Sequence, residues 1–318
     1  MRAIPLLTLL LGGWFVVPAH ADEAQDWLTR LGQAEQQQSF HGTFVYERNG
    51  SFSTHNIWHR VQDGKVRERL LQLDGSAQEV VRIDGRTQCV SGILIAGLGD
   101  SPSSAARTLD PQKLKNWYDL AVIGKSRVAG RAAVIVSLTP RDQHRYGFEL
   151  HLDKETGLPL KSLLLNERGQ LLERFQFTHL DTAEVPSDSD LQPGADCKKI
   201  VLDSDKASAV KAAQVWRSDW LPPGFELTSS TSRKDPETKT QVNSLMYDDG
   251  LARFSVFLEP LNGATITDTR TQLGPTVAVS RRLTTPQGEM MVTVVGEIPI
   301  GTAERIALSM RSDATATK

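Results

Sequence analysis

Residues 40–89 read FHGTFVYERNGSFSTHNIWHRVQDGKVRERLLQLDGSAQEVVRIDGRTQC. Four Asn-Gly or Asp-Gly dipeptides punctuate this stretch, at Asn49-Gly50, Asp63-Gly64, Asp74-Gly75 and Asp84-Gly85. Such pairs supply the left-handed backbone conformation that tight hairpin turns require. The stretch therefore predicts consecutive antiparallel hairpins in one sheet, with strands at 43–48, 54–61, 65–73 and 79–83.

The hairpin pattern continues along the rest of the chain. Further strands are expected at 120–128, 132–140, 148–152, 158–165, 171–178, 226–232, 241–247, 252–259, 277–283 and 290–297. Helical spacing of apolar residues predicts three short helices: one capped by Asp26, one at 111–118, and one at 302–310 capped by Thr302. Because hairpins need no crossover helices, the sequence predicts a mainly β fold (α+β) with antiparallel sheets.

The first 21 residues have the pattern of a cleaved export signal. Arg2 gives a basic start, residues 6–17 are apolar, and Ala19-His20-Ala21 provides small residues around a cleavage site. The apolar run is shorter than the roughly 20 residues that span a bilayer. We therefore expect a soluble periplasmic protein, with an uncleaved anchor as the alternative.

The remaining chain is long enough for two domains. Apolar strand patterns give way to polar residues, proline and glycine after residue 183, and resume near residue 213. The expected organisation is a signal peptide at 1–21, a first domain at 22–183, a linker at 184–212, a second domain at 213–310 and a disordered tail at 311–318. The Gly-, Ser- and Ala-rich residues 92–110 are expected to form a long loop inside the first domain.

Charge and composition exclude one class of partner. The chain has 36 basic and 38 acidic residues, and loss of Arg2 with the signal changes the net charge from −2 to −3. A nearly neutral chain without a basic stripe gives no reason to expect nucleic-acid binding.

Four segments carry a family resemblance: GTFVYERNG at 42–50, ERLLQLDG at 68–75, EVVR at 79–82 and YDDGLARFSVFLE at 247–259. They resemble the RseB/MucB family, and within it the MucB branch. Together with residues 295–297 and the last expected helix, they extend the resemblance over the whole exported chain. The succession of hairpins, including LDKETGLPL at 152–160, is also similar to the curved half-barrel of the LolA/LolB type. The resemblance thus implies such a half-barrel followed by a smaller antiparallel β domain with a terminal helix.

The family resemblance also implies a function. Its members are periplasmic regulators of the sigma-E envelope-stress pathway. The protein would bind the periplasmic domain of a membrane-anchored anti-sigma factor and shield it from site-1 proteolysis. Lipid or lipopolysaccharide in the half-barrel would release it. A periplasmic lipid or lipoprotein carrier is the alternative, and a homodimer is left open.

Binding residues can be suggested only as candidates. Apolar side chains on the concave side of the first sheet or on segments that could cover it suit acyl chains, although structural core is the more common role for any single one of them. These lipid-pocket candidates are Phe44, Tyr46, Ile57, Trp117 and Tyr118. Candidates for contact with the partner are Arg253, Arg281 and Arg282, with ordinary solvated arginines as the alternative.

No pattern marks an active site or a cofactor site. The chain has neither a Gly-x-Ser-x-Gly elbow nor a His-Glu-x-x-His helix. His55 and His59 lie an even number of residues apart on one expected strand and so share a face, but two residues are too few for a metal site. We expect no enzyme, no metal and no cofactor.

The two cysteines, Cys89 and Cys197, leave two alternatives open. In an oxidising compartment they can form one long-range disulfide or remain free thiols. The sequence does not decide between them, because a bridge requires the two Cα atoms to come within reach.

Overall fold

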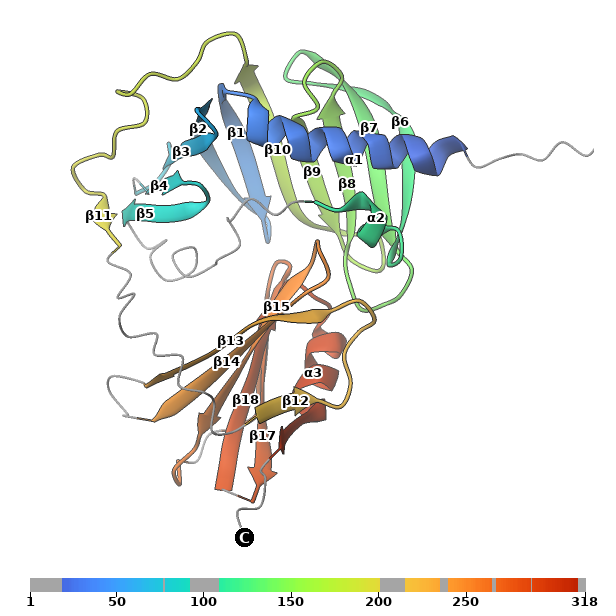
Figure 1. The fold of residues 1–318 in the computed structure, drawn as a ribbon, viewed down its shortest axis with the longest axis vertical. Helices are drawn as coiled ribbons and strands as arrows, with labels where there is room; N and C mark the ends of the chain where they lie inside the picture. Colours follow the sequence, from blue (N-terminus) through green and yellow to red (C-terminus); the bar gives the residue numbers. More distant parts are fainter. Residues whose placement is uncertain are drawn as a thin grey trace, which may run out of the picture.

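The computed structural model describes residues 19–76, 78–91, 109–200, 215–234, 240–264, 267–286 and 288–313. These residues form two β-sheet domains, one above the other in Figure 1. The predicted signal up to residue 18 and most of the expected loop at 92–110 lie outside the described residues.

The first domain is one antiparallel sheet of eleven strands, in the order β11-β5-β4-β3-β2-β1-β10-β9-β8-β7-β6. The sheet curves around the first helix (Figure 1). Two hairpin series, β1 to β5 and β6 to β10, are joined by the pairing of β1 with β10. The antiparallel, mainly β prediction is confirmed. The strands are β1 Phe40–Arg48, β2 Ser51–Gln62, β3 Lys65–Gln72, β4 Glu79–Ile83, β5 Arg86–Ser91, β6 Tyr118–Val128, β7 Arg131–Pro140, β8 Gly147–Asp153, β9 Pro159–Leu165, β10 Leu171–Asp181 and β11 Lys198–Lys199.

Three of the four predicted tight turns have the backbone that two-residue hairpins demand. Both residues of Asn49-Gly50, Asp63-Gly64 and Asp84-Gly85 have positive φ. The turn at Asp74-Gly75 differs, because only Gly75 has a positive φ. Asp74 instead accepts a hydrogen bond from the Thr54 amide at 2.9 Å, and the connection between β3 and β4 is longer.

Helix α1 (Ala19–Gln37) crosses one face of the first sheet (Figure 1). It begins seven residues before the predicted cap, Asp26. The reason is that Ala24 is fully buried, so the apolar stripe of Leu28 and Leu31 extends one turn further toward the N-terminus. We call the sheet face that packs on this helix, marked by Phe40 and Phe44, the inner face. The opposite face is the outer face.

Residues 182–200 pack along the outer face and are named the strap. The prediction placed most of them in a linker, and the structure differs. Arg60 of β2 donates to the Asp188 carboxylate at 2.6 Å, and Glu79 of β4 accepts from the Gly194 amide at 2.9 Å. Leu191 is 1% exposed, which shows that this segment contributes to the core. Alternating polar residues and prolines concealed this role in the sequence.

The second domain is a six-stranded antiparallel sheet in the order β13-β14-β15-β18-β17-β16, with α3 packed on β17 and β18. A separate two-stranded sheet, β12 paired with β19, joins the first and last strands of this domain. Its elements are β12 Val215–Ser218, β13 Glu226–Lys234, β14 Gln241–Asp248, β15 Arg253–Pro260, β16 Thr269–Leu273, β17 Thr276–Thr285, β18 Gly288–Gly296, α3 Ile300–Ser309 and β19 Met310–Asp313.

Two details at the end of the chain differ from the prediction. Helix α3 begins after Pro299, and Thr302 lies buried inside it rather than at its cap. Residues 311–313, expected to open a disordered tail, belong to β19 (310–313) because the backbone of this strand pairs with β12.

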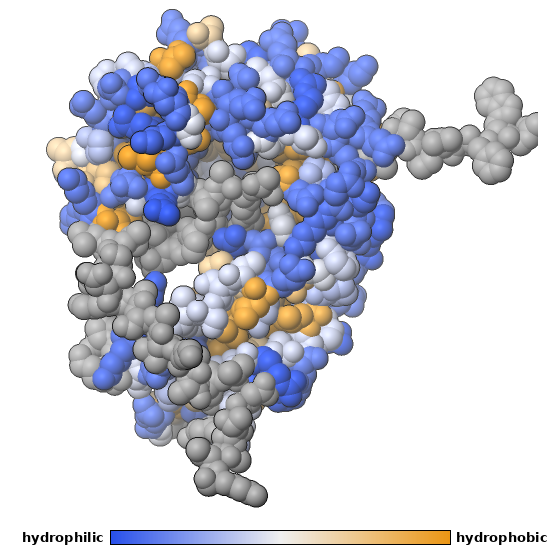
Figure 2. Space-filling model, viewed as in Figure 1, coloured by the Kyte–Doolittle hydropathy of each residue, from blue (hydrophilic) through white to orange (hydrophobic). Residues whose placement is uncertain are grey.

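Large exposed apolar side chains in the described part are dispersed over both domains, and the surface in Figure 2 is accordingly mostly hydrophilic with separate hydrophobic spots. They include Phe52, Leu73, Ile123, Val185, Leu273 and Leu308.

Candidate functional site

Three of the predicted lipid-pocket residues lie together on the inner face of the first sheet. Phe44 is buried, and its ring stacks on His55 with the centroids 5.1 Å apart. The Phe175 ring lies 4.6 Å from Phe44 on the other side. Tyr46 and Ile57 pack against the same apolar cluster and remain half-buried. The inner face therefore offers half-buried aromatic and aliphatic side chains beside a closed core.

A polar chain connects this face to the second domain. The Tyr46 hydroxyl donates to Glu173 Oε2 at 2.6 Å, and burial followed by the Glu173 charge raises the pKa of Tyr46 well above its ordinary value. Arg48 Nε lies 3.9 Å from the same oxygen. The Arg48 guanidinium also hydrogen-bonds to Thr276 and lies 3.8 Å from Glu297 Oε1. Tyr46 is therefore linked to the contact between the two domains through two side chains, Glu173 and Arg48.

Trp117 and Tyr118 do not join the inner-face group. They follow α2 (Pro111–Leu114) and lie where the two domains meet. Tyr118 is fully buried, and both aromatic rings lie 5.6 Å from the Arg145 guanidinium carbon. A Cβ added to Gly224 of the second domain would lie 2.2 Å from the Trp117 ring. The second domain's backbone thus packs directly on the Trp117 indole, whereas Tyr118 lies beside Arg145 in the buried first-domain cluster with Leu28 of α1 and Leu120 of β6.

Arg145 is the centre of this interface and is 1% exposed. Its Nη1 donates to Asp249 Oδ2 of the second domain at 2.6 Å, and its Nη2 donates to the Pro223 carbonyl at 2.5 Å. Nε and Nη2 also donate to the two carboxylate oxygens of Asp142. The guanidinium lies 5.1 Å from the Phe225 ring, a cation–π contact. One buried arginine thus binds three groups that belong to both domains.

Asp249 is held in place within the second domain before it meets Arg145. Its Oδ1 accepts hydrogen bonds from the amides of Leu251 and Ala252 at 2.8 and 2.7 Å. Burial raises the pKa of Asp249, and these amides and Arg145 act in the opposite direction. A fully buried carboxylate and a fully buried guanidinium are each costly without the other. The pair therefore favours one arrangement of the domains.

Further contacts surround the buried pair. The Tyr146 hydroxyl donates to the Ile298 carbonyl at 3.0 Å, and His144 Nδ1 lies 3.1 Å from Thr302 Oγ1. Lys113 Nζ forms an ion pair with Glu226 at 2.9 Å. Beside them is an open cavity of about 460 Å³, lined from both domains by Gln143, His144, Tyr146, Asn166, Glu167, Gln272, Pro299, Ile300, Gly301, Thr302 and Arg305.

The three predicted partner-binding arginines do not form one cluster. Arg253 pairs with Asp248 at 2.8 Å near the interface. Arg281, on β17, binds Asp268 at 3.1 Å and Glu304 at 2.9 Å. Arg282 points to the opposite face of that strand, and its side chain is exposed.

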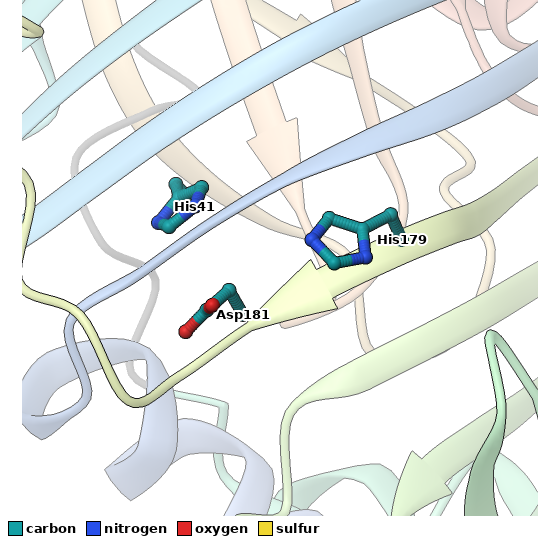
Figure 3. A group of neighbouring side chains, drawn as sticks. All are labelled: His41, His179 and Asp181. Atoms are coloured by element: carbon teal, nitrogen blue, oxygen red, sulfur yellow. The ribbon is translucent and has the colours of Figure 1, made fainter.

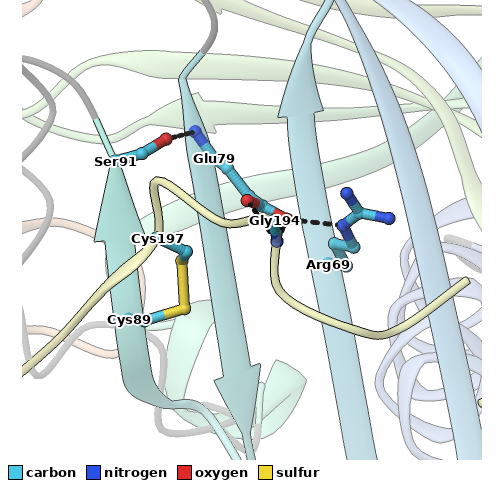
Figure 4. The surroundings of a disulfide bond; sticks show 6 residues. All are labelled: Arg69, Glu79, Cys89, Ser91, Gly194 and Cys197. Atoms are coloured by element: carbon cyan, nitrogen blue, oxygen red, sulfur yellow. Dashed lines mark hydrogen bonds and ion pairs between the residues drawn. A yellow bond between two sulfur atoms is a disulfide. The ribbon is translucent and has the colours of Figure 1, made fainter. Parts of the chain in front are cut away.

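Of the two states left open for the cysteines, a disulfide or free thiols, the structure has the disulfide. Cys89 on β5 and Cys197 at the end of the strap are joined by a disulfide that spans 108 residues (Figure 4). Glu79 lies next to it on β4, where Arg69 Nε donates to its carboxylate at 2.5 Å and the Gly194 amide donates at 2.9 Å. The bridge and this carboxylate fix the far end of the strap to the sheet.

His55 and His59 share the inner face, as their spacing predicted. Each already has protein partners: Ser53 lies 2.8 Å from His55, and Glu68 lies 2.9 Å from His59. Both are at least 90% buried, which agrees with ordinary sheet histidines.

The Arg145–Asp249 pair was missed by sequence reasoning. Residues 141–147 have the composition of a charged connector between two strands, and Asp248-Asp249-Gly250 has the composition of an ordinary turn. The only sequence signal was the resemblance of residues 247–259 to the family. That resemblance assigned no role to Asp248 or Asp249.

Family comparisons cover nearly all of the described chain. The MucB/RseB N-terminal domain model matches residues 23–195, and the MucB/RseB C-terminal domain model matches residues 210–311. The chain is 63% identical over 320 residues to sigma factor AlgU regulatory protein MucB of Pseudomonas aeruginosa, covering 100% of both chains. It is 27% identical to sigma-E factor regulatory protein RseB of Haemophilus influenzae, covering 98% of this chain and 99% of that one. None of the described helices has the length and apolar character needed to cross a membrane.

Solved structures agree with these matches. A complex of P. aeruginosa MucA and MucB covers 92% of this chain and 100% of the matched one, with 62% identity and a TM-score of 0.82. A structure of MucB covers 92% and 98%, with 60% identity and a TM-score of 0.69. Both domains and the full length of the chain thus place it in the MucB/RseB family of sigma factor regulatory proteins.

Proposed function

We propose that the protein is a periplasmic negative regulator of an envelope-stress sigma factor. It binds the periplasmic domain of a membrane-anchored anti-sigma factor and shields that domain from site-1 proteolysis. The observation that carries this proposal is 63% identity to P. aeruginosa MucB over the full length of both chains. It acts by binding rather than by catalysis, after export and removal of residues 1–21.

The domain arrangement supports binding of the partner by both domains together. At equal coverage, the TM-score is 0.82 to the MucA/MucB complex and 0.69 to MucB. The arrangement held by Arg145 and Asp249 is therefore the one proposed to bind the partner. A partner that prefers this arrangement also stabilises it, by an amount equal to its difference in affinity between the two states.

The effector is proposed to be lipid or lipopolysaccharide on the inner face of the first sheet. Phe44, Tyr46 and Ile57 supply the apolar surface. An acyl chain that displaces the Tyr46 ring would break its hydrogen bond to Glu173 and free Arg48 from its present position. Because Arg48 contacts Thr276 and Glu297, the domain contact would weaken and the partner would be released.

The arginine candidates enter the proposal unequally. Arg282 is exposed and can meet an acidic group of the partner directly. Arg253 and Arg281 would first have to exchange their present carboxylate partners.

A proteolysis-protection assay tests the proposal. The exported protein is mixed with the periplasmic domain of its host's anti-sigma factor and the cognate site-1 protease, with and without lipopolysaccharide. Protection that lipopolysaccharide abolishes is the expected result. Absence of binding and of protection, together with lipid retained by the protein, would instead favour the lipid-carrier function.

A matched pair of variants locates the effector response. Tyr46→Phe keeps the ring and removes the hydroxyl that binds Glu173. It should retain protection but change the lipopolysaccharide concentration that abolishes it by severalfold. Tyr247→Phe, a buried tyrosine of the second-domain core, is the control and should respond as the wild type does.

A further inference from the structure

Two histidines and one aspartate meet on the outer face of the first sheet, away from the domain interface. His41 on β1 lies opposite Asp181 in the β1–β10 register, and His179 precedes Asp181 by two residues on β10. Cross-strand partners share a face, and so do residues two apart on a strand. Figure 3 shows the two imidazole rings and the carboxylate close together at the end of these strands. One ligand atom from each residue lies within 4.8 Å of the other two.

The imidazole nitrogens of both histidines and one carboxylate oxygen of Asp181 are available to bind a metal ion. Within the described part of the chain, neither imidazole has a hydrogen-bond partner, in contrast to buried His55 and His59. Asp181 uses Oδ1 to accept the amides of Ala183 at 2.7 Å and Glu184 at 3.1 Å, which leaves Oδ2 free. These two amide hydrogen bonds, with a smaller effect of the two imidazoles, lower the pKa of the Asp181 carboxyl.

A carboxylate fixed by backbone amides resembles the outer support that protein metal ligands commonly have. A second carboxylate, Asp190 of the strap, lies close enough to His41 for that imidazole to contribute to lowering its pKa, after the Ser187 hydroxyl and amide. Two carboxylates thus act on His41, while the Arg69 guanidinium also acts on Asp190 and the Arg131 guanidinium on Asp181.

We propose that His41, His179 and Asp181 form a binding site for a divalent transition metal ion of the zinc type. Two imidazoles and one carboxylate are a common three-ligand zinc set, with water in the fourth position. This set also suits copper and nickel, whereas magnesium and calcium prefer oxygen ligands alone. The separation of 4.8 Å or less requires only small side-chain movements to close around the ion.

The position suggests what the ion does. Asp181 ends β10, and the strap begins at the next residue. The far end of the strap is fixed by the Cys89–Cys197 disulfide. A bound ion would fix the near end to β1, so that the strap is attached at both ends. The site does not depend on the proposed regulatory function, and its failure would leave that function untouched.

Zinc titration of the full exported chain tests the site. The protein is first treated with chelator, and Zn²⁺ is then added in competition with a fluorescent indicator. One saturable site per chain is expected. His41→Gln, His179→Gln and Asp181→Asn should each weaken binding by about 10- to 100-fold or more. Asp181→Asn keeps an oxygen for the two amides. The controls His144→Gln and Asp63→Asn, at an unrelated histidine and a hairpin turn, should bind as the wild type does.

Two further readouts separate loss of the site from loss of the fold. At 100 times its Kd, Zn²⁺ should raise the wild-type Tm by roughly 5–10 °C and leave the Tm of the site variants unchanged. In the wild type, hydrogen exchange of residues 183–190 should slow when Zn²⁺ binds. The absence of saturable binding, equal binding by wild type and site variants, or unchanged exchange at 183–190 would each overturn the proposal.

Discussion

Arg145 Nη1 and Asp249 Oδ2 lie 2.6 Å apart, on side chains that are 0% exposed and belong to different domains. Neither side chain is exposed to solvent that could replace its partner. The pair therefore contributes more to the choice of domain arrangement than to stability as such, because the desolvation of two charges offsets most of their attraction.

Removing one member of this pair should be strongly destabilising. Arg145→Ala leaves the Asp249 carboxylate buried without its cation, and the expected loss is about 3–5 kcal/mol. Unfolding in urea, followed by tryptophan fluorescence, measures it. The matched control is Arg141→Ala, whose ion pair with Asp119 is 2.8 Å long but mostly exposed. The control should cost no more than ~1 kcal/mol, and equal losses in both variants would contradict the account.

Gly224→Ala tests the close packing of the second domain on Trp117. Gly224 has a φ of +86°, and a Cβ there would lie 2.2 Å from the indole. Gly64→Ala is the matched control, because Gly64 has a φ of +70° with no atom within 4 Å of the added Cβ. The control should lose about 1–2 kcal/mol through backbone strain, and Gly224→Ala about 1–3 kcal/mol more through the clash. Similar Tm values for the two variants would rule out the clash.

Reduction of Cys89–Cys197 should release the far end of the strap. The bridge closes a loop of 108 residues, for which the chain-entropy model gives a stabilisation of up to about 4.7 kcal/mol. Reductant should lower Tm and speed hydrogen exchange in β4, β5 and residues 184–200. The double variant Cys89→Ala/Cys197→Ala should resemble the reduced wild type and ignore reductant. A reduced wild type with unchanged exchange in the strap would show that the bridge does not hold it.

Mild acid should destabilise the fold through three histidines, of which His55 and His151 are buried and His144 is half-buried. Burial holds the pKa of His55, His144 and His151 below the ordinary value of 6.5. Above pH 6.5 both folded and unfolded forms keep them neutral, so their contribution is complete there. Below pH 6.5 the unfolded chain takes up protons first, so stability falls. Tm should therefore fall from pH 7.5 to pH 5.5, and less so in His144→Gln. A Tm that rises over this range would contradict the assignment.

Local chemistry explains which features the sequence could predict. Asn49-Gly50, Asp63-Gly64 and Asp84-Gly85 fix their turns by themselves, and the strands between them follow from short-range alternation. Asp26 and Thr302 failed as helix caps because burial of Ala24 and of Thr302 itself outweighed capping preference. Tertiary packing decides such boundaries.

Contacts between distant residues could not be predicted in the same way. Arg145 and Asp249 are 104 residues apart, and each lies in a stretch with the composition of an ordinary loop. His41 and His179 come together only because β1 pairs with β10, a pairing that neither hairpin series implies. Tyr118 was a candidate for the lipid pocket because its aromatic ring is evident from the sequence. The buried Arg145 guanidinium beside that ring cannot be inferred from the sequence.

The most direct test of the central claim is the affinity of the full exported chain for the periplasmic domain of its host's anti-sigma factor, measured by isothermal titration. Wild-type protein and Arg141→Ala should bind with similar Kd, and Arg145→Ala should bind at least about tenfold more weakly, which corresponds to about 1.4 kcal/mol. Lipopolysaccharide should weaken binding by the wild type. Wild-type protein that does not bind, or Arg145→Ala that binds as tightly as the wild type, would contradict the account.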